Sequence, residues 1–220
     1  LLTVEAMGVD AIVMRHSADG AAHFASKAVS PVIINAGDGA HEHPTQGLLD
    51  MFTIREKKGS VTGKKVVIVG DILHSRVARS NIWALKKLGA EIHLCGPATL
   101  LPKDIAELGV QVHTKIEAAL QDADVINILR IQKERQQKGL FPSAREYARI
   151  FGINSSRIQL AKPDVLILHP GPMNRGLEIS FDVAYGDQSA IQEQVTNGVA
   201  IRMAILFRVL TGGKKIETAN

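Results

Sequence analysis

The residues best suited to chemistry follow short apolar runs, at points where the strands of a sheet would end. Three of them are arginines, Arg15, Arg76 and Arg130, each at or soon after the end of such a run. A guanidinium group presents a planar fork of donors that matches a phosphate or a carboxylate. Ligands of open α/β sheets bind beyond the carboxyl ends of the strands, so these side chains are candidates for holding an anionic substrate. Taken alone, Arg15 is also what a surface arginine that caps a strand end would look like.

A histidine and a glutamine flank the start of an expected helix in the segment His43-Pro44-Thr45-Gln46. Pro44 suits the first position of a helix, and His43 and Gln46 lie three residues apart across that turn. Both can reach a ligand at the helix N-terminus, where backbone N–H groups favour negative charge. A plain helix cap is the alternative interpretation. The pair His41 and His43 has no nearby third ligand of convincing spacing, so we predict no metal site.

Two further segments place polar groups where strands should end. Arg130 and Gln132 would project into one cleft if the chain stays extended beyond its strand. His169 is followed by Pro170-Gly171-Pro172, a stiff loop whose backbone carbonyls cannot join a helix. Those carbonyls are available to a substrate amide or amine. A charge cluster in solvent and an ordinary tight turn are the respective alternatives.

The sequence does not favour a nicotinamide dinucleotide cofactor. After the apolar run at residues 66–69 only Gly70 is present, whereas the dinucleotide fingerprint needs three glycines. The next expected strand ends in Cys95-Gly96-Pro97 and not in an acid for a ribose hydroxyl. The following helix has Ser75 as its expected cap and Arg76 in its first turn. A cation there opposes the helix dipole, a conflict that an anionic ligand would remove.

The elements that position these residues alternate between apolar runs and amphipathic stretches. Strands that are apolar on both faces and alternate with helices indicate an α/β fold with parallel sheets covered by helices. The expected strands are residues 10–14, 32–35, 65–69, 91–94, 110–113, 124–129 and 164–168. The expected helices are residues 21–29, 46–57, 76–88, 116–121 and about 187–210.

The glycine-flanked segment at residues 59–63 restarts the pattern and leads into a new strand, which indicates two domains. We expect the first domain to comprise residues 1–45 plus about 190–220, with the long final helix returning to pack on it. The second domain would then comprise residues about 46–189, with its first helix as the connector.

Composition narrows the functional classes. The chain has 220 residues, 45% of them hydrophobic and 22% charged, which is ordinary for a globular protein. Its net charge of +4 is dispersed and aromatic residues make up only 4%, so we predict no nucleic-acid partner. No apolar run approaches the ~20 residues that span a bilayer, so we predict no membrane partner. The single cysteine, Cys95, excludes an internal disulfide and fits a reducing, cytoplasmic setting.

Together these segments resemble the aspartate and ornithine carbamoyltransferase family. The segment His43-Pro44-Thr45-Gln46 is similar to its carbamoyl-phosphate motif, and Thr45 points to aspartate because ornithine enzymes typically carry Cys there. The resemblance spans essentially the whole chain and implies two α/β domains, the second Rossmann-like. Four other segments match aspartate enzymes in the expected order, at residues 14–17, 74–80, 129–135 and 169–172.

The resemblance implies transfer of the carbamoyl group of carbamoyl phosphate to the amino group of L-aspartate, without metal or organic cofactor. Arg15 and His43 would donate to the carbamoyl oxygen, and Gln46 would approach the carbamoyl nitrogen. Backbone groups of Gly171 and Pro172 would accept from that amide.

For the second substrate, the resemblance implies that Arg76 and Arg130 bind the two carboxylates of aspartate, with Gln132 assisting. A homotrimer, with possible higher assembly, is the implied oligomer because the family shares its sites across subunit interfaces.

The family also uses a Ser-Thr-Arg-Thr phosphate loop and a lysine loop from the neighbouring subunit, and neither occurs in this sequence. We therefore expect an N-terminal segment to be lacking, and residues 1–220 alone to catalyse poorly. Two alternatives remain open: a non-catalytic carbamoyltransferase-like binding subunit, and a transcarbamoylase for another amino acid.

Overall fold

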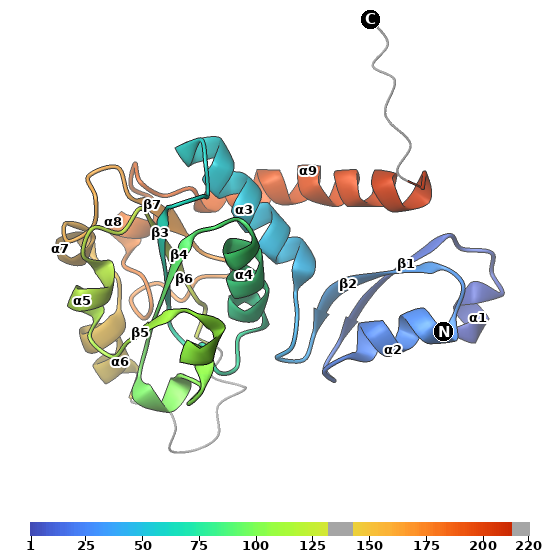
Figure 1. Cartoon of the computed structure of the whole chain (residues 1–220), viewed down its shortest axis with the longest axis horizontal. Helices are drawn as coiled ribbons and strands as arrows, with labels where there is room; N and C mark the ends of the chain where they lie inside the picture. The colour runs from blue at the N-terminus through green and yellow to red at the C-terminus, as the bar shows by residue number, and fades with distance from the viewer. Residues whose placement is uncertain (132–142, 213–220) are drawn as a thin grey trace, which may run out of the picture.

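Two parallel sheets organise the part of the chain that the computed structural model describes, residues 1–131 and 143–212 (Figure 1). The smaller sheet pairs β1 (Ala11–His16) with β2 (Val32–Asp38). Helix α1 (Leu2–Glu5) precedes β1, and α2 (Ala21–Ala28) connects the two strands. Every strand pair in both sheets is parallel, so the expected α/β class is confirmed.

The larger sheet has five strands in the order β5-β4-β3-β6-β7. The chain runs outward from β3 to β5, then returns to place β6 on the other side of β3. The carboxyl ends of β3 and β6 therefore lie side by side at a reversal of strand order, where α/β sheets bind ligands. The strands are β3 (Lys65–Val69), β4 (Glu91–Cys95), β5 (Gln111–His113), β6 (Val125–Ile128) and β7 (Leu166–Leu168).

Helices cover both faces of the larger sheet, as its apolar central strands β3 and β6 predict. Val67 and Val69 of β3 belong to one buried cluster, together with residues of α5 (Ile116–Leu120) and α6 (Ala144–Phe151). That cluster also includes residues of α8 (Phe181–Ala184), and Ile158 of α7 (Ser155–Ile158) packs against it.

The opposite face of the sheet packs on α3 and α4. Val66 and Ile68 belong to a second cluster with residues of α3 (Pro44–Lys58) and α4 (Arg76–Lys87). Two 3-10 turns, η1 (Ala98–Leu100) and η2 (Ile105–Leu108), lie between β4 and β5.

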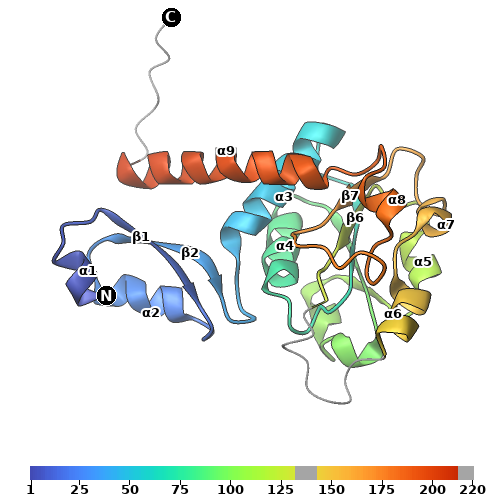
Figure 2. The ribbon, with the colours of Figure 1, turned by 180° about the vertical axis from the view of Figure 1, so that it is seen from behind.

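Helices α3 and α9 (Ile191–Leu210) pack together and connect the two sheets. Figures 1 and 2 show α9 extending from the larger sheet across to the β1–β2 layer. Residues of β1, β2, α3 and α9 line a shared small cavity there, so the final helix faces the first sheet across it.

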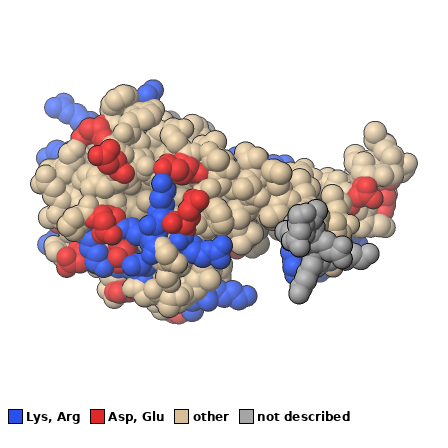
Figure 3. All heavy atoms as spheres, turned by 90° about the horizontal axis from the view of Figure 1, so that it is seen from above, with Lys and Arg blue, Asp and Glu red and all other residues tan. Residues whose placement is uncertain are grey.

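The surface is electrostatically mixed. On the face drawn in Figure 3, Lys and Arg are interspersed with Asp and Glu over the larger part of the molecule, and the narrower part is largely uncharged. Within residues 1–131 and 143–212, no helix is long and apolar enough to cross a membrane.

Candidate active site

A cavity of about 150 Å³ lies beyond the carboxyl ends of β3 and β6, where the two sheets approach each other. Seven of the eight side chains or loop positions predicted from the sequence line it, and the eighth, Gln132, lies outside the described residues. Among the described residues that line it there are three arginines and no carboxylate. The lining residues are Arg15, His43, Gln46, Ser75, Arg76, Val77, Arg130, Pro170, Gly171 and Pro172.

Helix α4 delivers Arg76 to this cavity. Ser75 caps the helix, as expected, because its Oγ accepts a hydrogen bond from the backbone N–H of Ala78 at 3.1 Å. The Arg76 side chain is 5% exposed and its Nη1 donates to the carbonyl oxygen of Gly39 at 3.4 Å. Gly37 has φ +117°, and a Cβ there would stand 2.7 Å from Arg76 Cζ. A glycine at this position thus leaves the space that the guanidinium occupies.

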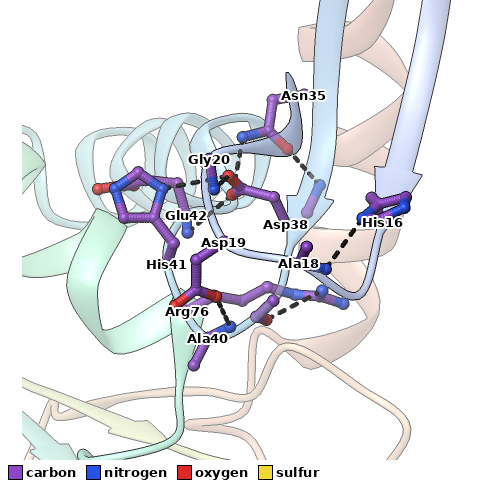
Figure 4. Close-up of polar contacts among 12 residues, drawn as sticks. His16, Ala18, Asp19, Gly20, Asn35, Asp38, Ala40, His41, Glu42 and Arg76 are labelled. Carbon is purple, nitrogen blue, oxygen red and sulfur yellow. Dashed lines mark hydrogen bonds and ion pairs between the residues drawn. The ribbon is translucent and has the colours of Figure 1, made fainter. Parts of the chain in front are cut away.

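The loop between β2 and α3 is organised by Asp38 (Figure 4). Its carboxylate accepts from the backbone N–H of Gly20 at 2.7 Å and of Glu42 at 3.0 Å, and from the Asn35 amide at 3.0 Å. Burial would raise the pKa of Asp38, but the hydrogen bonds, including one with His41, outweigh it and hold the pKa below its usual value. The loop therefore has a fixed geometry where it meets Arg76 and leads into α3.

His43 stands at the N-cap of α3, and its backbone N–H donates to Ser80 Oγ of α4 at 2.9 Å. Burial and the positive charges of Arg76, Arg15 and Arg202 lower the pKa of His43 from 6.5 to about 4. The ring is therefore neutral near pH 7 and has one N–H donor and one acceptor. Its buried Nδ1 has no hydrogen-bond partner among the described residues.

The loop after β7 is fixed by a buried histidine. The ring of His169 accepts from the backbone N–H of Gly171 at 2.9 Å through Nδ1, and its Nε2 lies 3.2 Å from Glu178 Oε1. The side chains of His169 and Glu178 are fully buried. The backbone N–H of His169 donates to Gln194 Oε1 at 2.8 Å, which ties the loop to α9. Gly171 and Pro172 are thus presented to the cavity on a rigid support.

Sequence reasoning overlooked several residues around the cavity. Ser75 was expected only as a cap but also lines the cavity, and Arg202 of α9 adds positive charge next to His43. Asp50 accepts a hydrogen bond from the Gln46 amide at 2.9 Å inside the protein. The expectation that the final helix returns to the first sheet was the one signal that could have pointed to Arg202. Among the described residues, no group of three or more His, Cys, Asp or Glu could hold a metal ion.

The arrangement suits substrates that carry several negative charges and one amide. Guanidinium groups from β1, α4 and the end of β6 meet a neutral imidazole, a side-chain amide and a loop with backbone carbonyls. Such groups bind and orient anions and stabilise charge on a carbonyl oxygen. Fold and site together define an α/β protein that binds anionic ligands at a strand-order reversal.

Comparison with protein families identifies the class further. Residues 1–56 match the family model "Aspartate/ornithine carbamoyltransferase, carbamoyl-P binding domain". Residues 62–209 match "Aspartate/ornithine carbamoyltransferase, Asp/Orn binding domain". The chain belongs to the aspartate/ornithine carbamoyltransferase family.

Individual relatives agree with this assignment. The aspartate carbamoyltransferase catalytic subunit of Desulforamulus reducens is 66% identical over 219 residues, which cover 100% of this chain and 70% of that protein. The corresponding subunit of Heliobacterium modesticaldum is 63% identical over 210 residues, covering 96% of this chain and 67% of that protein. The chain thus spans about two thirds of the length of these relatives.

Solved structures show the same fold. Ornithine carbamoyltransferase from Pyrococcus furiosus superposes with a TM-score of 0.82 at 31% identity, covering 96% of this chain and 70% of that one. Aspartate transcarbamoylase from Trypanosoma cruzi, in complex with N-(phosphonacetyl)-L-aspartic acid, superposes with a TM-score of 0.81 at 32% identity. That match covers 94% of this chain and 68% of the other.

Proposed function

We propose that this chain acts in an aspartate carbamoyltransferase catalytic subunit, which transfers the carbamoyl group of carbamoyl phosphate to the amino group of L-aspartate. The products are N-carbamoyl-L-aspartate and phosphate, in de novo pyrimidine biosynthesis. The observation that carries the proposal is the convergence of Arg15, Arg76, Arg130 and His43 on one cavity. The catalytic subunit of Desulforamulus reducens, 66% identical, supports the same reaction.

The charge of the cavity favours aspartate as the acceptor. Aspartate has two carboxylates, and Arg76 and Arg130 follow neighbouring strands, so each can bind one of them. The side chain of ornithine ends in an ammonium group, which would be placed among three guanidinium groups with no carboxylate in the described lining. Like charges at close range are mutually destabilising, so this second amino acid fits less well. Gln132 would assist at the aspartate carboxylates.

The carbamoyl group is assigned to the other residues that line the cavity. Arg15 and the neutral imidazole of His43 donate to the carbamoyl oxygen. Gln46 and the backbone groups of Gly171 and Pro172 accept from the carbamoyl NH₂ group. A neutral imidazole suits this position because it supplies an N–H donor and adds no further positive charge beside the arginines.

The reaction follows from this placement. The neutral amine of aspartate attacks the carbamoyl carbon, negative charge builds on the carbonyl oxygen, and the C–O bond to phosphate breaks. Donors aimed at that oxygen stabilise the transition state, and removal of one such donor typically costs ~3–4 kcal/mol. Holding both substrates in attack geometry lowers the barrier further, because their freedom has already been lost on binding. The departing phosphate accepts the proton that the amine releases.

Assembly, location and domain organisation are part of the proposal. We expect a homotrimer in the cytoplasm, and light scattering of the purified protein tests the trimer. The domains would be residues 1–45 with about 190–220, and residues about 46–189. The smaller sheet within residues 11–38 and the larger sheet within residues 65–168 support this division, with α3 and α9 as the connecting helices.

The function is tested by measuring carbamoyl-aspartate formation in two preparations. One is residues 1–220, and the other is a chimera in which the N-terminal part of the Desulforamulus reducens relative precedes Leu1. We expect the chimera to carbamoylate aspartate and the chain alone to do so poorly. Faster carbamoylation of ornithine or another amino acid would support a different transcarbamoylase. Substrate binding without turnover in either preparation would support a non-catalytic binding subunit.

A further inference from the structure

Beneath Gln46 lies a completely buried carboxylate that the mechanism above does not use. Asp50 is 0% exposed and stands one turn after Gln46 on α3. Among the described residues its hydrogen-bond partners are all neutral side-chain amides. A buried carboxylate that is held by amides and not by a cation is costly to maintain, which calls for a physical role.

Four amide groups from four elements donate to the two oxygens of Asp50. Oδ1 accepts from Gln46 Nε2 at 2.9 Å and from Gln194 Nε2 of α9 at 2.7 Å. Oδ2 accepts from Asn81 Nδ2 of α4 at 2.7 Å and from Asn127 Nδ2 of β6 at 3.2 Å. The Asp50 cluster, defined as these five residues, therefore lies among the elements that carry Arg76, Arg130 and the 169–172 loop.

The direction of these hydrogen bonds follows from a backbone group. The backbone N–H of His169 can only donate, and it points at Gln194 Oε1 at 2.8 Å. The other end of that amide, Nε2, therefore faces Asp50, and Oδ1 is an acceptor. An ionised carboxylate oxygen can only accept, so with Asp50 ionised the second group directed at Oδ1 is also a donor, the NH₂ group of Gln46.

The orientation of Gln46 has a consequence for the cavity. With Nε2 directed at Asp50, the atom left for a ligand is Oε1, which can accept but cannot donate. Oε1 makes no hydrogen bond to the described residues and is not among their fully buried, unpartnered atoms. It can therefore pair with an NH₂ group of a ligand, whereas a methyl group at that place would leave it unsatisfied.

We propose that Asp50 is a positioning residue that fixes the amide orientation of Gln46, and thereby makes the cavity select a carbamoyl group over an acetyl group. This inference rests on the proposed function and adds the origin of its donor specificity. Asp50 acts through Gln46 and does not touch the substrate. Burial raises the pKa of Asp50, and the four amide hydrogen bonds oppose that rise because they favour the ionised form.

The test uses two ligands that differ only in the group facing Gln46. Phosphonoacetamide carries an NH₂ group where acetonylphosphonate carries a methyl group, and both keep the phosphonate and the carbonyl oxygen. We expect the chimera described above to bind the amide at least about tenfold more tightly, because a site that pairs with an N–H rejects the analogue lacking it. In Asp50→Leu no acceptor is left for the NH₂ group of Gln46, so the Gln46 amide is no longer held in one orientation and the ratio falls towards one.

Thr53→Ala is the matched control. Thr53 is also buried on α3 and bonded to an amide of α9, from Asn197 Nδ2 at 3.1 Å, but it does not contact Gln46. We expect this variant to keep the full preference for the amide. Asp50→Leu with an unchanged preference would overturn the inference, as would a wild-type protein that does not distinguish the ligands. Failure of the wild type to bind either ligand would instead count against the proposed function.

A measurement on the unaltered protein covers the case in which Asp50→Leu does not fold. The NH₂ protons of Gln46, assigned by their disappearance in Gln46→Glu, should exchange with solvent more slowly than those of glutamine in a short peptide. Exchange at the peptide rate would mean that the NH₂ group faces the open cavity, and would contradict the proposed orientation.

Discussion

The arginine-lined cavity and the Asp50 cluster lie on opposite sides of one side chain, Gln46, and handle charge in opposite ways. The cavity gathers the positive side chains of Arg15, Arg76 and Arg130 around a space that a ligand can enter. The Asp50 cluster encloses a single negative group completely and surrounds it with neutral amides.

This difference separates two tasks that a binding site must perform. The positive charge of the cavity attracts an anionic substrate, and the attraction depends on the charges that the substrate carries. Charge in the cluster supplies orientation, because each amide that donates to Asp50 must turn its oxygen elsewhere. Substitutions in the cavity should therefore change affinity and rate, and substitutions in the cluster should change selectivity or stability.

Replacement of a cavity arginine should have the largest effect. For Arg76→Ala we expect kcat/KM for aspartate to fall about a hundredfold or more, since charge-assisted hydrogen bonds to a carboxylate are worth ~1.5–3 kcal/mol each. Steady-state kinetics of the chimera that carries this substitution measure this loss. Arg79→Ala, an exposed position one turn further along α4 that does not line this cavity, should change kcat/KM little. Equal losses in both variants would contradict the assignment.

The pH dependence of stability should report the charge environment of His43. Its folded-state pKa of about 4 lies below its ordinary value of 6.5, so the unfolded chain binds the proton more tightly. The His43 contribution is therefore present above pH 6.5 and is lost as the pH falls towards 4, by about 2 kcal/mol between pH 7 and pH 5.

Urea unfolding at pH 7 and at pH 5 measures the change in the free energy of unfolding. The His43→Gln variant should lack the part of that change that His43 contributes. Added phosphate should also weaken the effect, because an anion among the arginines raises the pKa of His43. A His43→Gln variant with the same pH dependence as the wild type would show that the ring is not in this environment.

A pair of glycine substitutions tests whether Arg76 depends on the shape of the β2–α3 loop. Gly37 and Gly59 have φ of +117° and +73°, so alanine is strained at both, by ~1–2 kcal/mol. Only at Gly37 does the new Cβ meet Arg76, whereas nothing lies within 4 Å of it at Gly59. Of the two variants, we expect only Gly37→Ala to raise the KM for aspartate. The rise should be about tenfold if the binding free energy falls by about 1.4 kcal/mol. Similar KM values in both variants would mean that the guanidinium is not held by this contact.

The smallest effect is expected away from both regions. Thr53→Ala should lower the free energy of unfolding by about 1 kcal/mol, because it removes a buried hydrogen bond between α3 and α9. Its kcat and both KM values should match the wild type. Changed kinetics in this variant would show that the α3–α9 contact as a whole, and not the Asp50 cluster, orients the site.

Much of the fold could be predicted because its signals are local. Apolar runs marked the central strands of the larger sheet, and Pro44 and Ser75 marked the starts of two helices that the structure confirms. Short helices such as α6 and α8 were not predicted. They are held by packing on the larger sheet, which leaves little trace in a segment of four to eight residues.

The site was predictable where residues follow strand ends, and not where partners are distant in sequence. Arg76 and Arg130 converge on the cavity because the parallel strands β3 and β6 bring their carboxyl ends together, and Arg15 reaches it from β1 of the other sheet. Asp50 looks like an ordinary polar position within a helix. Its amide partners on α4, β6 and α9 stand 31, 77 and 144 residues away, so its burial depends on tertiary structure alone.

The central claim is that guanidinium groups from both parts of the molecule bind one multiply charged substrate pair. Calorimetric titration of the chimera with N-(phosphonacetyl)-L-aspartic acid tests this claim most directly, because that compound joins a phosphonate to two carboxylates. We predict tight binding that weakens at least about a hundredfold in each of Arg15→Ala, Arg76→Ala and Arg130→Ala. Binding that is absent in the wild type, or unchanged in these variants, would contradict the account.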